Sequence, residues 1–138
     1  MIVDTDSDFG ARVARRLGDE QIVWLTTIGA DQTPQPSPVW FLWDGETILM
    51  YSQSGAPKVR NVGANPRVAV NFNSDPHGGD VVVLIGEAAL DEAATGTPPP
   101  GYVAKYADGM ASLGMTPEAF AAEYPTAIRI RPTRLRGH

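Results

Sequence analysis

The sequence predicts a mainly-β protein of the α+β class, built as a small six-stranded antiparallel barrel with peripheral helices. Six segments rich in β-branched and aromatic residues recur along the chain, mostly in hairpin order and separated by short turns. Helical spacing of apolar residues is confined to a few short segments. A length of 138 residues fits one domain, residues 1–138, which can bury a proper core.

The composition excludes several classes of function. A net charge of −5 argues against a general nucleic-acid binder, which usually presents a basic face. Cysteine is absent, so disulfides, thiolate metal sites and thiol nucleophiles are excluded, and two histidines are too few for an all-histidine metal site. The sequence shows neither a membrane-spanning apolar run nor a signal peptide. We therefore expect a soluble cytoplasmic protein without a membrane partner.

The N-terminal part of the chain predicts one helix and three strands. An apolar stripe at i, i+4 and i+8 indicates an amphipathic helix over residues 7–18, which Ser7 can cap and Gly18 can end. The strands are expected at residues 21–28, 36–43 and 46–53.

Prolines begin the second of these strands. A proline has no backbone N–H to donate to a neighbouring strand, so this part of the strand must lie at an edge or a bulge. Exposed backbone at such an edge can bind a planar ligand. Asp44-Gly45 then forms a two-residue hairpin turn into the third strand.

The rest of the chain predicts three helices and three strands. The helices are expected at residues 57–64, 101–113 and 116–124, and the strands at residues 67–73, 80–90 and 126–131. Asn65-Pro66 stops the first helix, and Gly86 marks a bulge in the longest strand.

Two of the predicted strand segments, residues 48–51 and 81–85, are apolar on both faces. In an antiparallel sheet this pattern means that the outer face is covered as well. A short chain with few helices covers such a face most easily with a second copy of itself, so a homodimer is expected.

Residues 52–61 have the chemistry of an anion site. A proline begins the helix here, so free backbone N–H groups and the positive end of the helix dipole point at one spot. The hydroxyls of Ser52 and Ser54 flank that spot, and Lys58 and Arg60 add two cations. The alternative is a solvated helix start. The acidic background favours anion capture, most naturally of a phosphate on a cofactor.

Other residues give weaker indications of a site. His77 could lie over a pocket, although a role in the turn at residues 74–79 is the preferred interpretation. The three tryptophans are more consistent with a core or an interface than with stacking platforms. No serine–histidine pair or histidine–carboxylate spacing indicates a catalytic residue, so none is assigned, and no metal site is expected.

Several motifs match one family. They are residues 29–41, Asp44-Gly45, Tyr51-Ser52, the Lys-x-Arg-Asn run at residues 58–61, residues 65–68, 80–82, 86–88 and 128–132. With these motifs the chain resembles the split β-barrel flavoprotein superfamily of pyridoxamine 5′-phosphate oxidase over nearly its whole length. It looks closest to the actinobacterial branch that binds the deazaflavin coenzyme F420. The resemblance implies a split β-barrel of the FMN-binding type.

The resemblance also implies site residues. Lys58 and Arg60 would hold the phosphate side of the cofactor tail, helped by Ser52 and Gln53. The backbone of four strand residues would line the cofactor ring: Ser37, Pro38, Val39 and Trp40. The partner subunit would close the site through the loop that carries His77.

One departure from the family pattern bears on the cofactor. The oxidase proper holds the FMN phosphate with an arginine and a lysine on the second strand, and residues 34–43 contain neither. F420 is therefore the expected cofactor and FMN the alternative. The expected function is hydride transfer from reduced F420 to a small organic substrate. The alternatives are an FMN-dependent oxidase or reductase and a non-catalytic F420 carrier or sensor.

Overall fold

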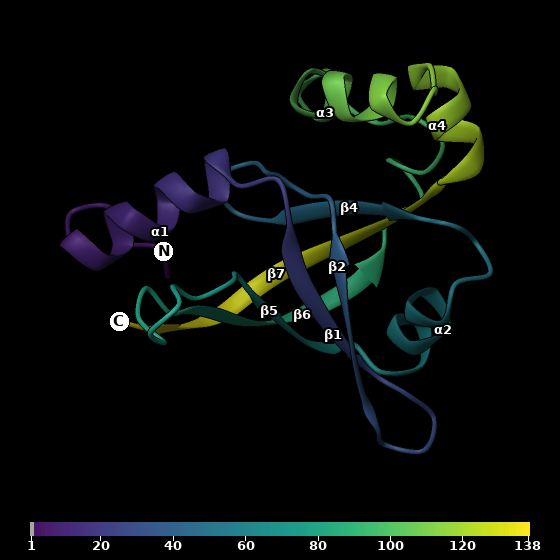
Figure 1. Cartoon of the computed structure of the whole chain (residues 1–138). Coiled ribbons are helices and arrows are strands. Elements are labelled where there is room, and N and C mark those ends of the chain that lie inside the picture. The colour runs from purple at the N-terminus through teal and green to yellow at the C-terminus, as the bar shows by residue number, and fades with distance from the viewer. Residues whose placement is uncertain (1) are drawn as a thin grey trace.

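The computed structural model describes residues 2–138, and these residues form four helices and seven strands (Figure 1). The helices are α1 (Asp8–Asp19), α2 (Pro57–Ala64), α3 (Pro100–Ser112) and α4 (Pro117–Glu123). The strands are β1 (Val23–Ile28), β2 (Pro34–Val39), β3 (Leu42–Trp43), β4 (Ile48–Ser52), β5 (Arg67–Asn71), β6 (Val82–Leu90) and β7 (Thr126–Gly137). Among the described residues, no helix is both long and apolar enough to cross a membrane.

The strands form one curled antiparallel sheet. Their order is β2-β1-β5-β6-β7-β4-β3, and every neighbouring pair is antiparallel. The two edge strands, β2 and β3, are consecutive in the chain and only Trp40 and Phe41 separate them. The sheet must therefore curl until its two edges approach each other. The result is a half-barrel of the mainly-β α+β class, as the sequence predicts.

The expectation of six strands is wrong, because the strand predicted at residues 36–43 is divided into β2 and β3. At the division, the backbone N–H of Phe41 donates to the Tyr106 hydroxyl at 2.8 Å. The Phe41 carbonyl accepts from the Lys105 ammonium at 2.9 Å. Side chains of α3 thus take the place of a ladder partner. The prediction that the proline-rich part lies at an edge is confirmed, since β2 is an edge strand.

The other large difference concerns β7, which continues well beyond the predicted strand at residues 126–131. Gly86 on β6 pairs with Pro132, whereas Ile85 pairs with Arg134, so Thr133 is an extra residue on β7. This bulge tolerates a proline that has no ladder donor. A Cβ at Gly86 would lie 2.7 Å from the Arg131 carbonyl oxygen, which explains why glycine is required there.

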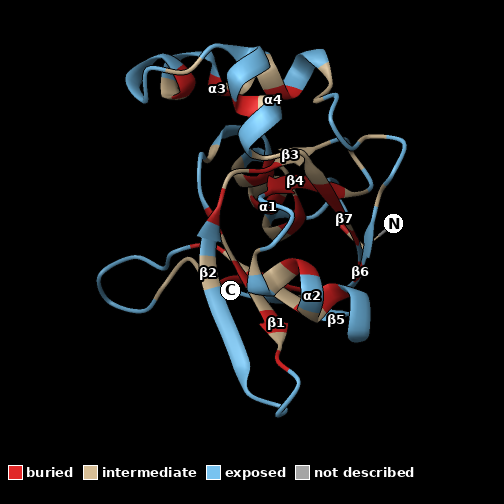
Figure 2. Ribbon diagram, turned by 90° about the vertical axis from the view of Figure 1, so that its right-hand side faces the viewer, coloured by how far each residue is buried: buried red, intermediate tan, exposed pale blue. Residues whose placement is uncertain are grey.

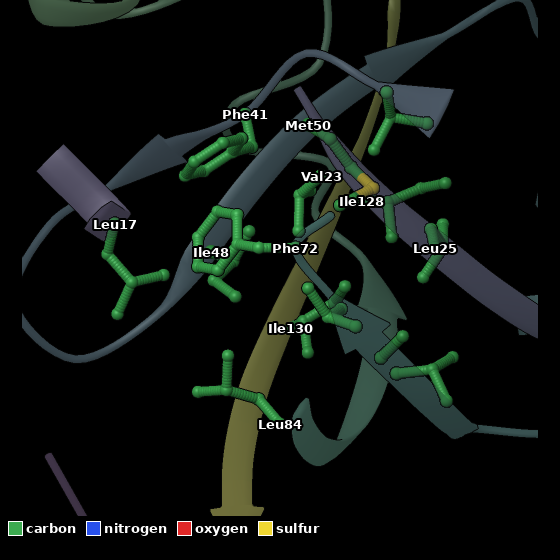
Figure 3. Close-up of a cluster of buried hydrophobic side chains, with 14 of the residues drawn as sticks. Leu17, Val23, Leu25, Phe41, Ile48, Met50, Phe72, Leu84, Ile128 and Ile130 are labelled. Carbon is green, nitrogen blue, oxygen red and sulfur yellow. The ribbon is translucent and has the colours of Figure 1, made fainter. Parts of the chain in front are cut away.

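The main core fills the inside of the curled sheet (Figure 3). Strand side chains of one face provide most of it, among them Leu25, Ile48 and Ile130, each at most 1% exposed. Helix α1 adds Val13 and Leu17 to this core, and α2 adds two valines. This burial holds α1 and α2 against the sheet, because each large apolar side chain that is buried contributes about 1.5–3 kcal/mol to the stability of the fold.

A second cluster covers the outer side of β4. All five residues of β4 are buried, as the red strand in Figure 2 shows. Leu49 and Tyr51 pack outward against Tyr102 of α3 and Phe120 of α4. The apolar outer face of this strand is therefore covered by the chain's own helices. That finding removes one of the two reasons for expecting a homodimer; the other lies on β6.

Candidate functional site

A cavity of about 460 Å³ lies where β2 and β4 end, where α2 begins, and under the α3–α4 pair. Three residues of the β2 end form one wall: Pro38, Val39 and Trp40. The β4 end and the α2 start form the next: Tyr51, Ser52, Gln53, Ala56 and Lys58. The helical side closes it with Tyr102, Leu113, Phe120 and Tyr124. We call this space the β2–α2 cavity.

Lys58 provides the charge of this cavity. It lies in the first turn of α2, which begins at Pro57 and has no side-chain cap. Burial lowers the pKa of Lys58, because the half-buried ammonium is desolvated. Within residues 2–138 its ammonium makes no ion pair or hydrogen bond by the usual distance criteria. A desolvated cation at the positive end of a helix favours an anionic ligand.

Two polar side chains extend this charged end of the cavity. Ser52 is a buried residue, 5% exposed, that lines the cavity, and its hydroxyl makes no hydrogen bond to the described protein atoms. Gln53 donates its amide N–H to the Glu123 carboxylate at 2.8 Å, which leaves its amide oxygen available. The orphaned hydroxyl of Ser52 and the unpaired ammonium of Lys58 are the groups that a bound phosphate would satisfy.

The opposite end of the cavity is aromatic. The Trp40 ring stacks on Tyr106 with centroids 4.5 Å apart and an interplanar angle of 4°. It also stacks on Phe120, at 5.6 Å and 14°. Burial raises the pKa of Tyr102 and of Tyr51, so both phenols stay protonated and this wall stays neutral at pH 7. Such a wall fits a planar, largely apolar ring system.

Six of the residues expected at the site line the cavity, and four do not. Those that line it are Pro38, Val39, Trp40, Ser52, Gln53 and Lys58. Ser37, one residue before the wall, pairs with Leu25 of β1. The Ser54 hydroxyl shares a hydrogen bond with the Thr126 hydroxyl at 2.9 Å. The guanidinium of Arg60 points back to the Gly55 carbonyl at 2.7 Å, and this side chain lines a separate hollow.

His77 lies in the β5–β6 loop, across the molecule from α2 (Figure 1). Its backbone N–H donates to the Asp75 carboxylate at 2.8 Å. Arg16 holds both ends of this loop, through the carbonyls of Asn73 and Asp80, each at 2.8 Å. Within one chain, His77 does not reach the β2–α2 cavity.

Sequence reasoning missed the aromatic wall. Tyr102, Tyr106 and Met110 recur at i, i+4 and i+8, which marks the buried face of α3. That spacing does not show which side of the sheet the helix covers, so the link to the cavity needed the tertiary structure. Arg129 and Arg131 of β7 pair with Asp91 and Glu87, each at 2.7 Å.

No group of three or more histidine, aspartate and glutamate side chains among the described residues could hold a metal ion. The β2–α2 cavity has one cation with a free hydroxyl at one end and a neutral aromatic wall at the other.

Comparison with known families identifies the fold. A family model described as pyridoxamine 5′-phosphate oxidase matches residues 9–137. A search of curated proteins gave no significant match. Solved structures with the same fold include a protein described as an F420 reductase, with 28% sequence identity and a TM-score of 0.65. That alignment covers 88% of this chain and 94% of the reductase.

The descriptions of two further solved structures name other ligands. A FAD-binding protein from Mesorhizobium loti shares 16% identity at a TM-score of 0.64, covering 91% of this chain and 88% of that one. HutZ, described as the heme storage protein from Vibrio cholerae, shares 16% identity at a TM-score of 0.65, covering 92% of both chains. At these identities the likeness shows the fold alone.

Proposed function

Because the chain belongs to the pyridoxamine 5′-phosphate oxidase family, we propose that it binds F420 in the β2–α2 cavity and reduces a small organic substrate. The observation that carries this proposal is Lys58. It is a half-buried, unpaired cation at the polar end of a cavity whose other walls are neutral. The similarity to the F420 reductase supports the choice of cofactor class.

The two ends of the cavity suggest the orientation of the cofactor. Lys58, Ser52 and the uncapped start of α2 would hold the phosphate. Pro38, Val39 and Trp40 would lie against the ring. When bound, the reduced deazaflavin ring supplies the hydride, and the protein supplies position, charge and exclusion of water.

FMN is the alternative cofactor, and charge favours F420. The phosphate of FMN is a monoester, which carries about −1.5 to −2 at pH 7. Lys58 is the one cationic residue that lines the β2–α2 cavity as the structure describes it. Residues 34–43 offer no second cation, so the cavity lacks the pair of cations that a doubly charged phosphate monoester favours.

The test of cofactor choice is a titration of the purified protein with F420 and FMN side by side. We expect F420 to bind with a dissociation constant of about 1 μM or lower, which is about −8 kcal/mol. FMN should bind more weakly. Tight co-purification of FMN together with no binding of F420 would show that the proposal is wrong.

A carrier or sensor that binds F420 without turnover is the alternative from another class. A panel of enones and quinones, mixed with reduced F420 and the protein, separates the two functions. Oxidation of reduced F420 faster than in protein-free controls supports the enzyme. Tight binding without turnover on the whole panel favours the carrier.

We also propose that a second copy of the chain completes the site. His77 does not line the cavity of its own chain, and its loop is hydrogen-bonded to Arg16 and to the Asp75 carboxylate. A loop fixed in this way could close the cavity of a partner. The cytoplasmic location expected from the sequence stays a prediction.

A further inference from the structure

The division between β2 and β3 is held by one side chain of α3 that reaches three backbone groups. The Tyr106 hydroxyl accepts from the Phe41 N–H at 2.8 Å. The same hydroxyl lies 2.8 Å from the Gln21 carbonyl and 3.0 Å from the Phe41 carbonyl. Tyr106 therefore ties α3 to the division and to the residues that lead into β1.

Lys105, the preceding residue, also binds the backbone of Phe41. Its ammonium donates to the Phe41 carbonyl at 2.9 Å and lies 3.7 Å from the centroid of the Phe41 ring. Because the Phe41 carbonyl already has this donor, the single proton of Tyr106 is available for Gln21. Two adjacent residues of α3 thus satisfy both backbone groups of Phe41, which no strand satisfies.

These contacts also affect Trp40, which precedes Phe41 in the chain and lines the cavity. The Phe41 side chain is fully buried in the main core, whereas the Trp40 ring stacks on Tyr106 and on Phe120. Gly109 of α3 leaves room for this ring, since a Cβ there would lie 3.1 Å from it. The helical pair therefore contacts both the backbone next to Trp40 and the Trp40 ring itself.

We propose that Tyr106 and Lys105 are positioning residues, which set the ring-facing wall of the β2–α2 cavity by holding the backbone of Phe41. The effect on ligand binding rests on the proposed function. The effect on Trp40 does not, because it belongs to the protein alone. Neither residue lines the cavity, so neither contacts the ligand directly.

The test substitutes Tyr106→Phe, which keeps the stacked ring and removes only the hydroxyl. Protein labelled with 5-fluorotryptophan gives three ¹⁹F resonances, and Trp40→Phe identifies that of Trp40. We expect the Trp40 resonance to shift or broaden in Tyr106→Phe while those of Trp24 and Trp43 stay in place. The F420 dissociation constant should rise about three- to tenfold, the effect of losing one net hydrogen bond.

Lys105→Met tests the second contact and keeps the apolar stem of the side chain. It should move the Trp40 resonance in the same way, and Lys105→Arg should restore it. Ile130→Val is the matched control, because it should cause a comparable loss of stability in the main core while it changes a residue of β7 and leaves the α3 contacts of Phe41 in place. It should change neither the Trp40 resonance nor F420 affinity.

An unmoved Trp40 resonance in both Tyr106→Phe and Lys105→Met would overturn the proposal. An equal movement in Ile130→Val would do so as well, because the effect would then follow stability alone. If F420 fails to bind the wild type while the Trp40 resonance responds as expected, the positioning role stands and the proposed cofactor is wrong. If F420 binds equally well to wild type and Tyr106→Phe, the role in binding is refuted.

Discussion

Lys58 is the side chain on which the proposed phosphate contact depends. Lys58→Ala should weaken F420 binding by about 1.5–3 kcal/mol, the range for a hydrogen bond to a charged group. The phosphate is remote from the reacting ring, so the contact is equal in ground and transition states. Turnover at saturating F420 should therefore change little. Dissociation constants, turnover and melting temperature of the variant check this expectation.

Arg60→Ala is the matched control for Lys58→Ala, because both cations lie in α2 but only Lys58 faces the cavity. Its effect on F420 affinity should be less than about threefold, that is, under 0.7 kcal/mol. An equal loss in both variants would show that Arg60 turns into the cavity when ligand is bound. Unchanged affinity in Lys58→Ala would move the anion site elsewhere.

The sequence predicted where α2 begins better than it predicted which cations face the cavity. Helix α2 begins at Pro57 as expected, and Ser52 and Lys58 both line the cavity. Arg60 is two residues after Lys58, and side chains at i and i+2 of a helix do not face each other. Counting cations along the sequence could not show this, whereas helical geometry could have.

Lys105 makes a pH-dependent contribution to stability. Burial lowers its pKa from 10.5 to about 8, against the opposing attraction of Asp19 and Glu20. Between pH 8 and 10.5 the unfolded chain therefore holds a proton that the folded chain has released, so this group raises the free energy of unfolding as pH rises. The difference in unfolding free energy between wild type and Lys105→Met should shift in favour of wild type from pH 7.5 to 9.5.

Urea unfolding of both proteins across this pH range measures the difference. Other titrating groups act equally in the two proteins and cancel, including the tyrosines whose pKa values are raised by burial. A difference that stays constant with pH would show that Lys105 keeps an ordinary pKa and is not desolvated.

Among the strands, the β6–β7 pair has a bulge that depends on Gly86. Gly86→Ala should lower the free energy of unfolding by about 1–3 kcal/mol, because its Cβ would lie 2.7 Å from the Arg131 carbonyl oxygen and the backbone would have to shift. Gly18→Ala is the matched control: it lies within α1 and its Cβ would meet no atom within 4 Å. It should stabilise the protein by about 0.5–1 kcal/mol. Denaturant unfolding gives both values, and a neutral Gly86→Ala would mean that the bulge relaxes freely.

Elements with local signals were predicted closely, and those set by tertiary contacts were not. Pro57 and Asn65-Pro66 delimit α2 from the sequence alone, and Thr116 caps α4 through its hydroxyl. By contrast, β2 and β3 are separate because α3 binds the backbone of Phe41, a residue 65 positions away from Tyr106. No local pattern records such a contact.

At the scale of the whole molecule, helices cover the outer side of the sheet unevenly. Helices α3 and α4 cover the outer side of β4, so the apolar pattern of residues 48–51 needs no partner. Strands β1, β5 and β6 are consecutive in the sheet, and none of the helices formed by residues 2–138 lies over their outer side (Figure 1). Half-buried side chains gather there without a charge among them: Trp24, Thr26, Ile28, Ala69, Asn71, Val83 and Ile85. This uncharged patch is where we propose that the second copy packs.

The patch predicts a homodimer that a single charge should dissociate. Ala69 lies at its centre, paired with Thr26 on one side and Ile85 on the other. Light scattering of the wild type should give twice the chain mass of 14.8 kDa. Ala69→Glu should give the monomer mass, because burying an unpaired carboxylate in an apolar interface is costly.

Ala89→Glu makes the same change on the exposed outer face of β6, beyond the patch, and should remain a dimer. Circular dichroism of both variants separates dissociation from unfolding. A monomeric wild type at micromolar concentration would refute the dimer and the shared site together. A dimeric, folded Ala69→Glu would place the interface elsewhere. If F420 affinity also falls in monomeric Ala69→Glu, while Ala89→Glu binds as the wild type does, the second copy contributes to the cavity as proposed.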